Sequence, residues 1–338
     1  MSLEAMIGAV LIAGLTVYCL TGGADFGGGI LDLFATGPRA NDQRKLIASE
    51  IGPIWEANHV WLIVLIVILF IDFPIVYAAI STALHWPLLV MLVGIVLRGS
   101  GFVFRAYGSS ETTYIWGRVF AAASLMTPFS LGVILGAITS PALDWDGHKI
   151  SHLDGILPWL RPFPIMMGIL TLLLFSFLAA VYLGRQAPSQ PLQDDFRRRA
   201  LTIGGLLVIT GGICLFMAYE HAPQIAEKLE TKAHAIPWLT ASTISMAACM
   251  WMVWHHRWNG ARRLAAGTAI LVILGWAFSQ YPYLIYPEIT ISDAAAPPKV
   301  LSITLWSLGL GASILTPSFI LLFRVFNAAG RHQTTSQI

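Results

Sequence analysis

Nine apolar stretches, each about as long as a bilayer is thick, limit what this chain can fold into. A transmembrane helix needs about 20 consecutive, mostly apolar residues. Only 11% of the residues are charged, against about 25% in a soluble domain, so lipid must cover much of the surface. No stretch alternates as a membrane strand does, so we predict an all-α polytopic membrane protein. The predicted spans are 4–26, 52–71, 76–97, 117–139, 162–184, 200–219, 236–255, 264–285 and 300–324.

Lysine and arginine are divided unequally between the two sides of this nine-span arrangement. Fifteen fall on one side and five on the other. The positive-inside rule then places the N-terminus outside and the C-terminus in the cytoplasm. We predict one integral membrane domain over residues 1–338, with spans one to five within 1–185, a polar cytoplasmic link at 186–199, spans six to nine within 200–326, and a cytoplasmic tail at 327–338.

Two carboxylates lie in the first two apolar runs, at positions where the neighbouring residues predict lipid. Asp25 is near the inner end of the first run, and Glu56 is near the start of the second. A charged side chain at the membrane centre costs about 2.5–3.5 kcal/mol on insertion scales, so such an acid usually faces a protein interior or a wet path. Asp25 and Asp32 share one helix face, and with Glu56 and water they would form an inward proton path. The alternative is that Asp25 caps a helix end and Glu56 pairs with an arginine such as Arg98.

Two histidines, His59 and His85, lie well inside predicted spans. Glu56 and His59 have the spacing of a Glu-x-x-His metal motif. Di-iron bundles need two such pairs and two further glutamates, whereas this sequence has one pair. Neither histidine stands in a Cys-x-x-Cys-His sequence, and a hydrogen-bonded buried histidine is more common than a haem ligand. We therefore predict no metal site and no cofactor in this chain, with His59 as a hydrogen-bonded neighbour of the acids.

Two arginines, Arg98 and Arg105, follow the third apolar run seven residues apart on one helix face. They either reach the cytoplasmic headgroups, or one of them is the counter-ion of Glu56 or Asp25. We take Arg98 as a supporting residue of the acidic pair. The sequence has no glycine-rich phosphate loop and no basic arm, which argues against a nucleic-acid partner.

Three motifs stand in the first quarter of the chain: Thr-Gly-Gly-Ala-Asp-Phe-Gly-Gly-Gly-Ile-Leu from residue 21, Glu-Ile-Gly-Pro-Ile-Trp-Glu-Ala-Asn-His-Val-Trp-Leu from residue 50, and Phe-Pro-Ile-Val-Tyr-Ala from residue 73. They resemble subunit II of cytochrome bd-type quinol oxidases. Matches near residues 281, 293 and 316 extend the resemblance over essentially the whole chain. Glu56 and His59, where the best-known members have aspartate and glutamine, favour the cyanide-insensitive branch.

This resemblance implies a partner and the partner's cofactors. Subunit II pairs with a haem-bearing subunit I that oxidises quinol and reduces oxygen to water. Subunit I carries two b-type haems and one d-type haem, or b-type haems only. The implied fold is two four-helix bundles plus one peripheral helix, in the bacterial cytoplasmic (inner) membrane. Asp25 and Glu56 match the family's acidic positions on a proton path from the cytoplasm. A structural quinone and a small single-span accessory subunit are further candidates.

Two other functions fit the same carboxylates. In a proton-coupled secondary transporter, broken helices usually recur in two repeats, but the glycines at 27–29 have no clear counterpart in the second half. In a purely structural subunit, the acids would serve only to pair with arginines.

Overall fold

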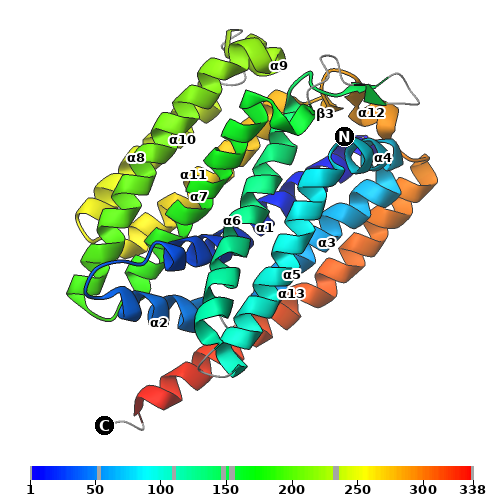
Figure 1. Cartoon of the computed structure of the whole chain (residues 1–338). Coiled ribbons are helices and arrows are strands. Elements are labelled where there is room, and N and C mark those ends of the chain that lie inside the picture. Colours follow the sequence, from blue (N-terminus) through cyan, green and yellow to red (C-terminus); the bar gives the residue numbers. More distant parts are fainter. Residues whose placement is uncertain are drawn as a thin grey trace.

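Nine long helices make up most of the part of the chain that the structure describes (Figure 1). The structure is a computed structural model. It describes residues 2–51, 55–108, 112–145, 150–151, 157–230 and 236–335. The long helices are α1 (Leu3–Leu33), α3 (Trp55–Asp72), α5 (His85–Tyr107), α6 (Thr113–Thr139), α7 (Pro162–Gln186), α8 (Gln190–His221), α10 (Ile236–Trp254), α11 (Trp258–Gln280) and α13 (Pro298–Thr335). Shorter elements are α2 (Ala40–Ile51), α4 (Pro74–Ala83), α9 (Pro223–Glu230), α12 (Ile291–Ala294), the 3-10 turn η1 (Pro158–Leu160), and the hairpins β1–β2 (Asp144–Trp145, Ile150–Ser151) and β3–β4 (Tyr283–Ile285, Ile289–Thr290).

The number of membrane spans depends on one broken helix. Within the described residues, eight helices are long and apolar enough to cross a membrane, and the α3–α4 pair makes nine if it counts as one span. The two halves of this pair are bent by 115°. Pro74 is the first residue of α4 and has no N–H to continue the α3 ladder, and it disfavours a helical conformation at Phe73. The predicted all-α polytopic class is confirmed, and the N- and C-termini lie at opposite ends of the helices (Figure 1).

Several helices begin or end at other residues than the predicted spans do. The third span was predicted over 76–97, but residues 74–83 form α4 and the long helix α5 begins at His85. The polar link predicted at 186–199 is mostly the first turns of α8, which begins at Gln190 after Ser189. The eighth span ends at Gln280 rather than 285, because Pro282 cannot extend the helix and the next residues pair as β3. Hydropathy locates apolar surface, but helices also continue through polar residues outside the lipid.

The helices form the two predicted groups of four with one helix outside. In one group, α7 contacts α8 and α11, and α10 contacts α8 and α11, which closes a ring. In the other, α1 contacts α3 and α6, and α5 packs along α6. Helix α13 contacts α1 and α3 at the periphery, and α1 also packs against α7 and α11. Helix α1 therefore lies at the junction of the two groups.

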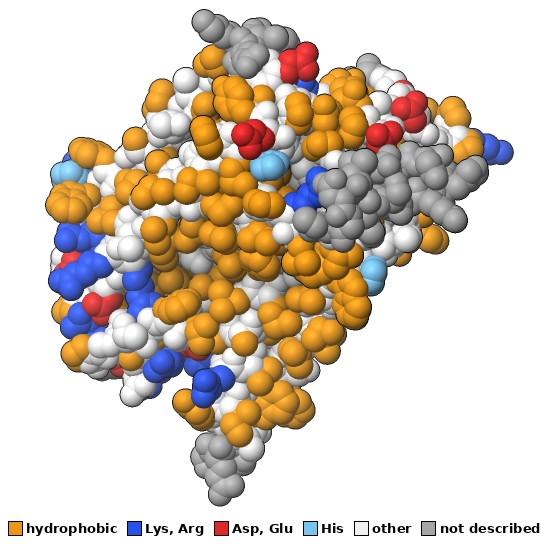
Figure 2. Space-filling view, turned by 45° about the horizontal axis from the view of Figure 1, so that its top comes forward, with side chains coloured by type: hydrophobic (Ala, Val, Ile, Leu, Met, Phe, Trp, Pro, Cys, Tyr) orange, Lys and Arg blue, Asp and Glu red, His pale blue; other side chains and the backbone are white. Residues whose placement is uncertain are grey.

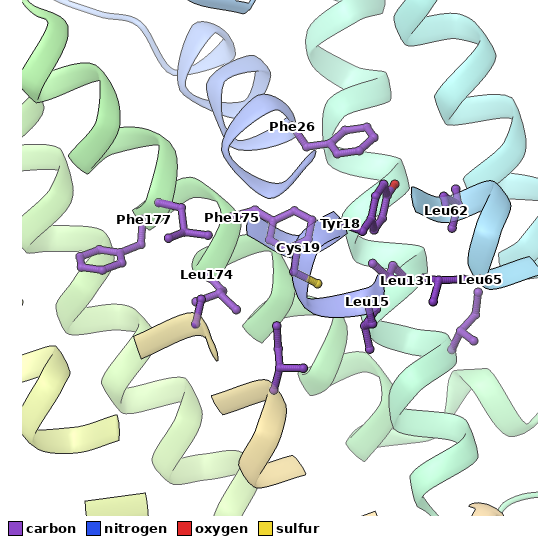
Figure 3. Packing of buried hydrophobic residues seen from close by; sticks show 14 of the residues in the cluster. Leu15, Tyr18, Cys19, Phe26, Leu62, Leu65, Leu131, Leu174, Phe175 and Phe177 are labelled. Atoms are coloured by element: carbon purple, nitrogen blue, oxygen red, sulfur yellow. The ribbon is translucent and has the colours of Figure 1, made fainter. Parts of the chain in front are cut away.

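Apolar side chains cover the outside of the molecule and also fill its core. Figure 2 shows hydrophobic side chains across the middle of one face, with most of the basic ones toward one end. In the core, Leu15 of α1, Leu65 of α3 and Leu131 of α6 converge (Figure 3). Phe175 of α7 lies directly against α1, where Gly23 and Gly27 leave room for it (Figure 3).

We predict that Gly27→Ala lowers stability by about 1–3 kcal/mol, because the added methyl group overlaps the backbone carbonyl of Phe175 and the side chain of Ala179. The measurement is the thermal unfolding of the purified protein in detergent, followed by circular dichroism. The matched control is Gly212→Ala in α8, where a Cβ meets no atom within 4 Å. If the two variants had the same melting temperature, the close packing of α1 on α7 would not contribute to stability.

Candidate functional site

The centre of the site is a buried ion pair between α1 and α5. Asp25 and Arg98 are 7% and 1% exposed, and Arg98 Nη2 donates to Asp25 Oδ1 at 2.6 Å. The amide of Asn58 in α3 donates weakly to Asp25 Oδ2 at 3.5 Å and to the carbonyl of Thr21 at 3.4 Å. A buried carboxylate is tolerated only with such partners, because desolvation alone costs several kcal/mol. Three helices thus meet at one charged position.

Two aromatic rings enclose the Arg98 guanidinium. Its carbon lies 4.6 Å from the Phe26 ring centroid and 5.1 Å from that of Phe120. The His59 ring meets the edge of Phe26, with centroids 5.9 Å apart. A guanidinium over aromatic faces gains cation–π attraction, and this attraction is larger when water is excluded. The α1, α3, α5 and α6 helices therefore share one polar centre inside an apolar bundle.

A second ion pair repeats this arrangement nearer the end of α1. Arg105 Nη1 and Nη2 donate to the two carboxylate oxygens of Asp32 at 2.9 and 3.3 Å. Both acids and both arginines are seven residues apart, so the pairs are about 10 Å apart along the helices at 1.5 Å per residue. The Arg105 side chain is 21% exposed and that of Arg98 only 1%. The line of charges therefore runs from a solvated end toward the buried centre.

Further arginines anchor the same end of α1. Arg199 of α8 donates to the carbonyls of Leu31 and Phe34 at 3.0 and 2.8 Å, which satisfies the last turn of α1. Arg39 binds Asp195 of α8 through two bonds of 2.8 and 2.6 Å. Hydrogen bonding to Asp195 raises the pKa of Arg39 above its usual value. These contacts hold the C-terminal end of α1, next to the Asp32–Arg105 pair, against α8 of the second helix group.

The structure decides some of the alternatives left open by the sequence. Asp25 lies inside a helix that ends at Leu33, so the helix-cap hypothesis for it was wrong. Arg98 is buried beside Asp25 rather than extended to headgroups, and His59 lies in the same cluster. The side chain of Glu56 lies outside the described residues, and only its place in the first turn of α3 is known. His85 is elsewhere, exposed, with Nδ1 bonded to the carbonyl of Thr82.

Sequence reasoning missed Asn58 of this cluster, and also the buried Tyr18 one helix repeat away on α1. Asn58 belongs to the second family-like motif, but only the fold brings it to Asp25. Tyr18 is 1% exposed, and its hydroxyl has no hydrogen-bond partner among the described residues. The signal for Tyr18 was its spacing, because Tyr18, Asp25 and Asp32 recur every seven residues on one face of α1. The described part of the chain holds no group of three His, Cys, Asp or Glu side chains that would bind a metal.

Taken together, the fold and the buried charges define a polytopic all-α membrane protein with ion-paired acids at membrane depth. The chain belongs to the family of cytochrome bd terminal oxidase subunit II, whose model matches residues 3–326.

Individual relatives agree with this assignment. The chain is 28% identical over 203 residues to cytochrome bd ubiquinol oxidase subunit 2 of Bacillus subtilis, a match that covers 59% of this chain and 58% of that protein. It is 26% identical over 182 residues to cytochrome bd-I ubiquinol oxidase subunit 2 of Escherichia coli K12, covering 53% and 46% of the two chains. The matches thus span about half the length of these relatives.

A solved structure shows the same fold. A chain of the bd oxidase from Geobacillus thermodenitrificans superposes with a TM-score of 0.81 at 22% identity, covering 96% of this chain and 99% of that one.

We predict that Asp25→Asn destabilises the protein by about 3–5 kcal/mol, because it leaves the Arg98 guanidinium buried without its counter-ion. The double variant Asp25→Asn/Arg98→Gln should lose less than the sum of the two single changes. The measurement is a double-mutant cycle on thermal unfolding in detergent. The matched control is the same cycle on Asp32 and Arg105, where partial exposure should make the coupling smaller. Additive single and double variants would contradict the pairing.

Proposed function

We propose that this chain is subunit II of a cytochrome bd-type quinol oxidase and packs against a haem-bearing subunit I in the bacterial cytoplasmic membrane. Support comes from the family match over residues 3–326 and from the names of the relatives in two bacteria. Subunit I, in this proposal, holds the b- and d-type haems, or b-type haems only, oxidises ubiquinol or menaquinol, and reduces oxygen to water. A structural quinone and a small accessory subunit stay candidates of the same proposal.

The role of this chain, in the proposal, is to guide protons from the cytoplasm toward the partner. The observation that carries it is the line of polar side chains on α1, from Asp32 through Asp25 to the buried Tyr18 hydroxyl. An acid at membrane depth usually marks a proton or ion route. The basic end of the molecule, where this line opens, is the cytoplasmic side by the positive-inside rule.

The contacts of Asp25 affect how it can bind a proton. Both carboxylate oxygens of Asp25 already accept from fixed donors, Arg98 and Asn58. A proton arriving at Asp25 therefore has to displace one of these donors. We assign both Asp25 and Glu56, which is in the first turn of α3, to the proton path, and Arg98 to supporting Asp25 in the apolar core. His59, against Phe26, supports the same cluster.

The transporter alternative gains no support, since the named relatives are oxidase subunits.

We predict that Glu56→Gln lowers quinol-driven oxygen consumption of the purified complex about tenfold or more, because an amide cannot relay a proton. Haem absorption of the complex should be unchanged. The matched control is Glu50→Gln, which changes an exposed acid whose recorded partner is the amide of Gln186. Parental turnover in Glu56→Gln would remove the proton role. A complex that purified without any haem protein would remove the oxidase assignment itself.

A second prediction separates conduction from stability at Tyr18. Since its hydroxyl has no hydrogen-bond partner among the described residues, Tyr18→Phe should melt at or above the parental temperature. Oxygen consumption should nevertheless fall several-fold if the hydroxyl lies on the proton route. If both oxygen consumption and the melting temperature were unchanged, the Tyr18 hydroxyl would not be part of the proton route.

A further inference from the structure

A polar pocket lies in the second helix group, away from the acids of α1. It has a volume of about 570 Å³ and lies where α7 ends, α10 ends and α11 begins. Its walls are Arg185 and Gln186 of α7, residues 256–257 of the short connection after α10, and residues 258–260 in the first turn of α11. Gly260 lets the first turn of α11 approach α10 closely, because a Cβ there would overlap the sulfur of Met252. The pocket is therefore built by three helix ends held closely together.

Two exposed arginines in the pocket have no acidic partner among the residues that the structure describes. Arg185 Nε donates to Asn259 Oδ1 at 2.7 Å, and Arg257 lies 5.3 Å from the ring centroid of Trp251. Among the described residues, neither guanidinium forms an ion pair with a carboxylate. The first turn of α11, a helix of 23 residues, adds the positive end of its dipole to the same wall.

The nearby acids are already bound by other groups. Glu50 of α2 accepts from the Gln186 amide at 3.0 Å. Asp194 of α8 lies 3.3 Å from His256 Nε2 and 3.7 Å from Arg197 Nε. The Nη1 of Arg197 is also 3.0 Å from His256 Nε2. When His256 Nε2 accepts from Arg197, the ring proton is on Nδ1, which has no partner among the described residues. The pocket therefore has more hydrogen-bond donors than acceptors, and these donors can bind an anion.

The height of the pocket relative to the membrane favours a lipid over a soluble anion. Trp251 and Trp254, in the last turn of α10, are 50% and 59% exposed. Tryptophans at the ends of spans mark the level of the lipid headgroups. An acyl chain would continue from the pocket along the apolar outer face of α10, whereas a free anion would gain only the polar contacts.

We propose that this pocket binds the phosphodiester group of an anionic glycerophospholipid, held by the guanidinium groups of Arg185 and Arg257 and by the first turn of α11. The glycerol and acyl chains extend over Trp251 and Trp254. Guanidinium and phosphate form charge-assisted, often bidentate hydrogen bonds, and these are stronger than neutral ones. The proposal is independent of the proton route, since it involves no residue of that line.

Native mass spectrometry of the complex purified through this chain provides the test. The complex is delipidated in detergent and titrated with phosphatidylglycerol, with phosphatidylcholine, and with inorganic phosphate. We expect the parental complex to retain phosphatidylglycerol in preference to phosphatidylcholine. In Arg185→Gln/Arg257→Gln this affinity should fall about tenfold, as expected for the loss of charged hydrogen bonds. The matched control is Arg118→Gln, which changes an exposed arginine whose recorded contacts are with the ring and the hydroxyl of Tyr114.

The possible results distinguish a bound lipid from a bound soluble anion. Loss of phosphatidylglycerol in the double variant, with parental binding in Arg118→Gln, supports the proposal. Equal binding of the two lipids by the parent, or parental binding by the double variant, overturns it. If inorganic phosphate bound the delipidated parental complex and phosphatidylglycerol did not, the result would also overturn it, in favour of a soluble anion. Unchanged haem absorption in every variant shows that the complex is intact.

Discussion

The buried contact between Asp25 and Arg98 constrains the rest of the structure. Two charges at lipid depth persist only if each satisfies the other and the remaining polar atoms find donors or acceptors. Helix α5 packs mainly along α6, so the long arginine side chains are what tie it to α1. The seven-residue repeat makes this tie specific, because rotating either helix by one residue, 100°, would break both pairs. Apolar packing alone would accept many such rotations.

The same helix uses its opposite side for close packing. Gly23 and Gly27 face Phe175 of α7, and each is two residues from Asp25. Two residues turn a helix by about 200°, so the glycines and the carboxylate lie on opposite sides of α1. On one side, α1 packs against the backbone of α7, in the group of α7, α8, α10 and α11. On the other side, α1 carries the carboxylate that contacts Arg98 of α5 and Asn58 of α3, in the group that α1 forms with α3, α5 and α6. This division explains why α1, with a mostly apolar sequence, lies at the junction of both groups.

The all-α polytopic class of this fold follows from hydropathy, and the local breaks do not. Apolar length predicted all the long helices, because lipid demands internally satisfied backbone. It did not predict the separate helix α4, although Pro74 was the available signal, nor that α8 begins at Gln190 in a polar stretch. The pairing of Asp25 was open in the sequence, since spacing along one chain does not show which helices meet. For Glu56, the described residues leave the expectation a proposal.

The arginines at the basic end contribute differently despite their equal charge. Arg39 and Arg105 bind carboxylates, and Arg199 completes the last turn of α1, so these side chains serve the fold around α1. Arg185 and Arg257, at the ends of α7 and α10, have no such duty among the described contacts. The positive-inside rule counts all of them alike. Arg39, Arg105 and Arg199 thus have partners within the chain, whereas the guanidinium groups of Arg185 and Arg257 form no ion pair among the described residues. Both guanidinium groups are exposed, and at the level of the headgroups the abundant anion that they can bind is lipid phosphate.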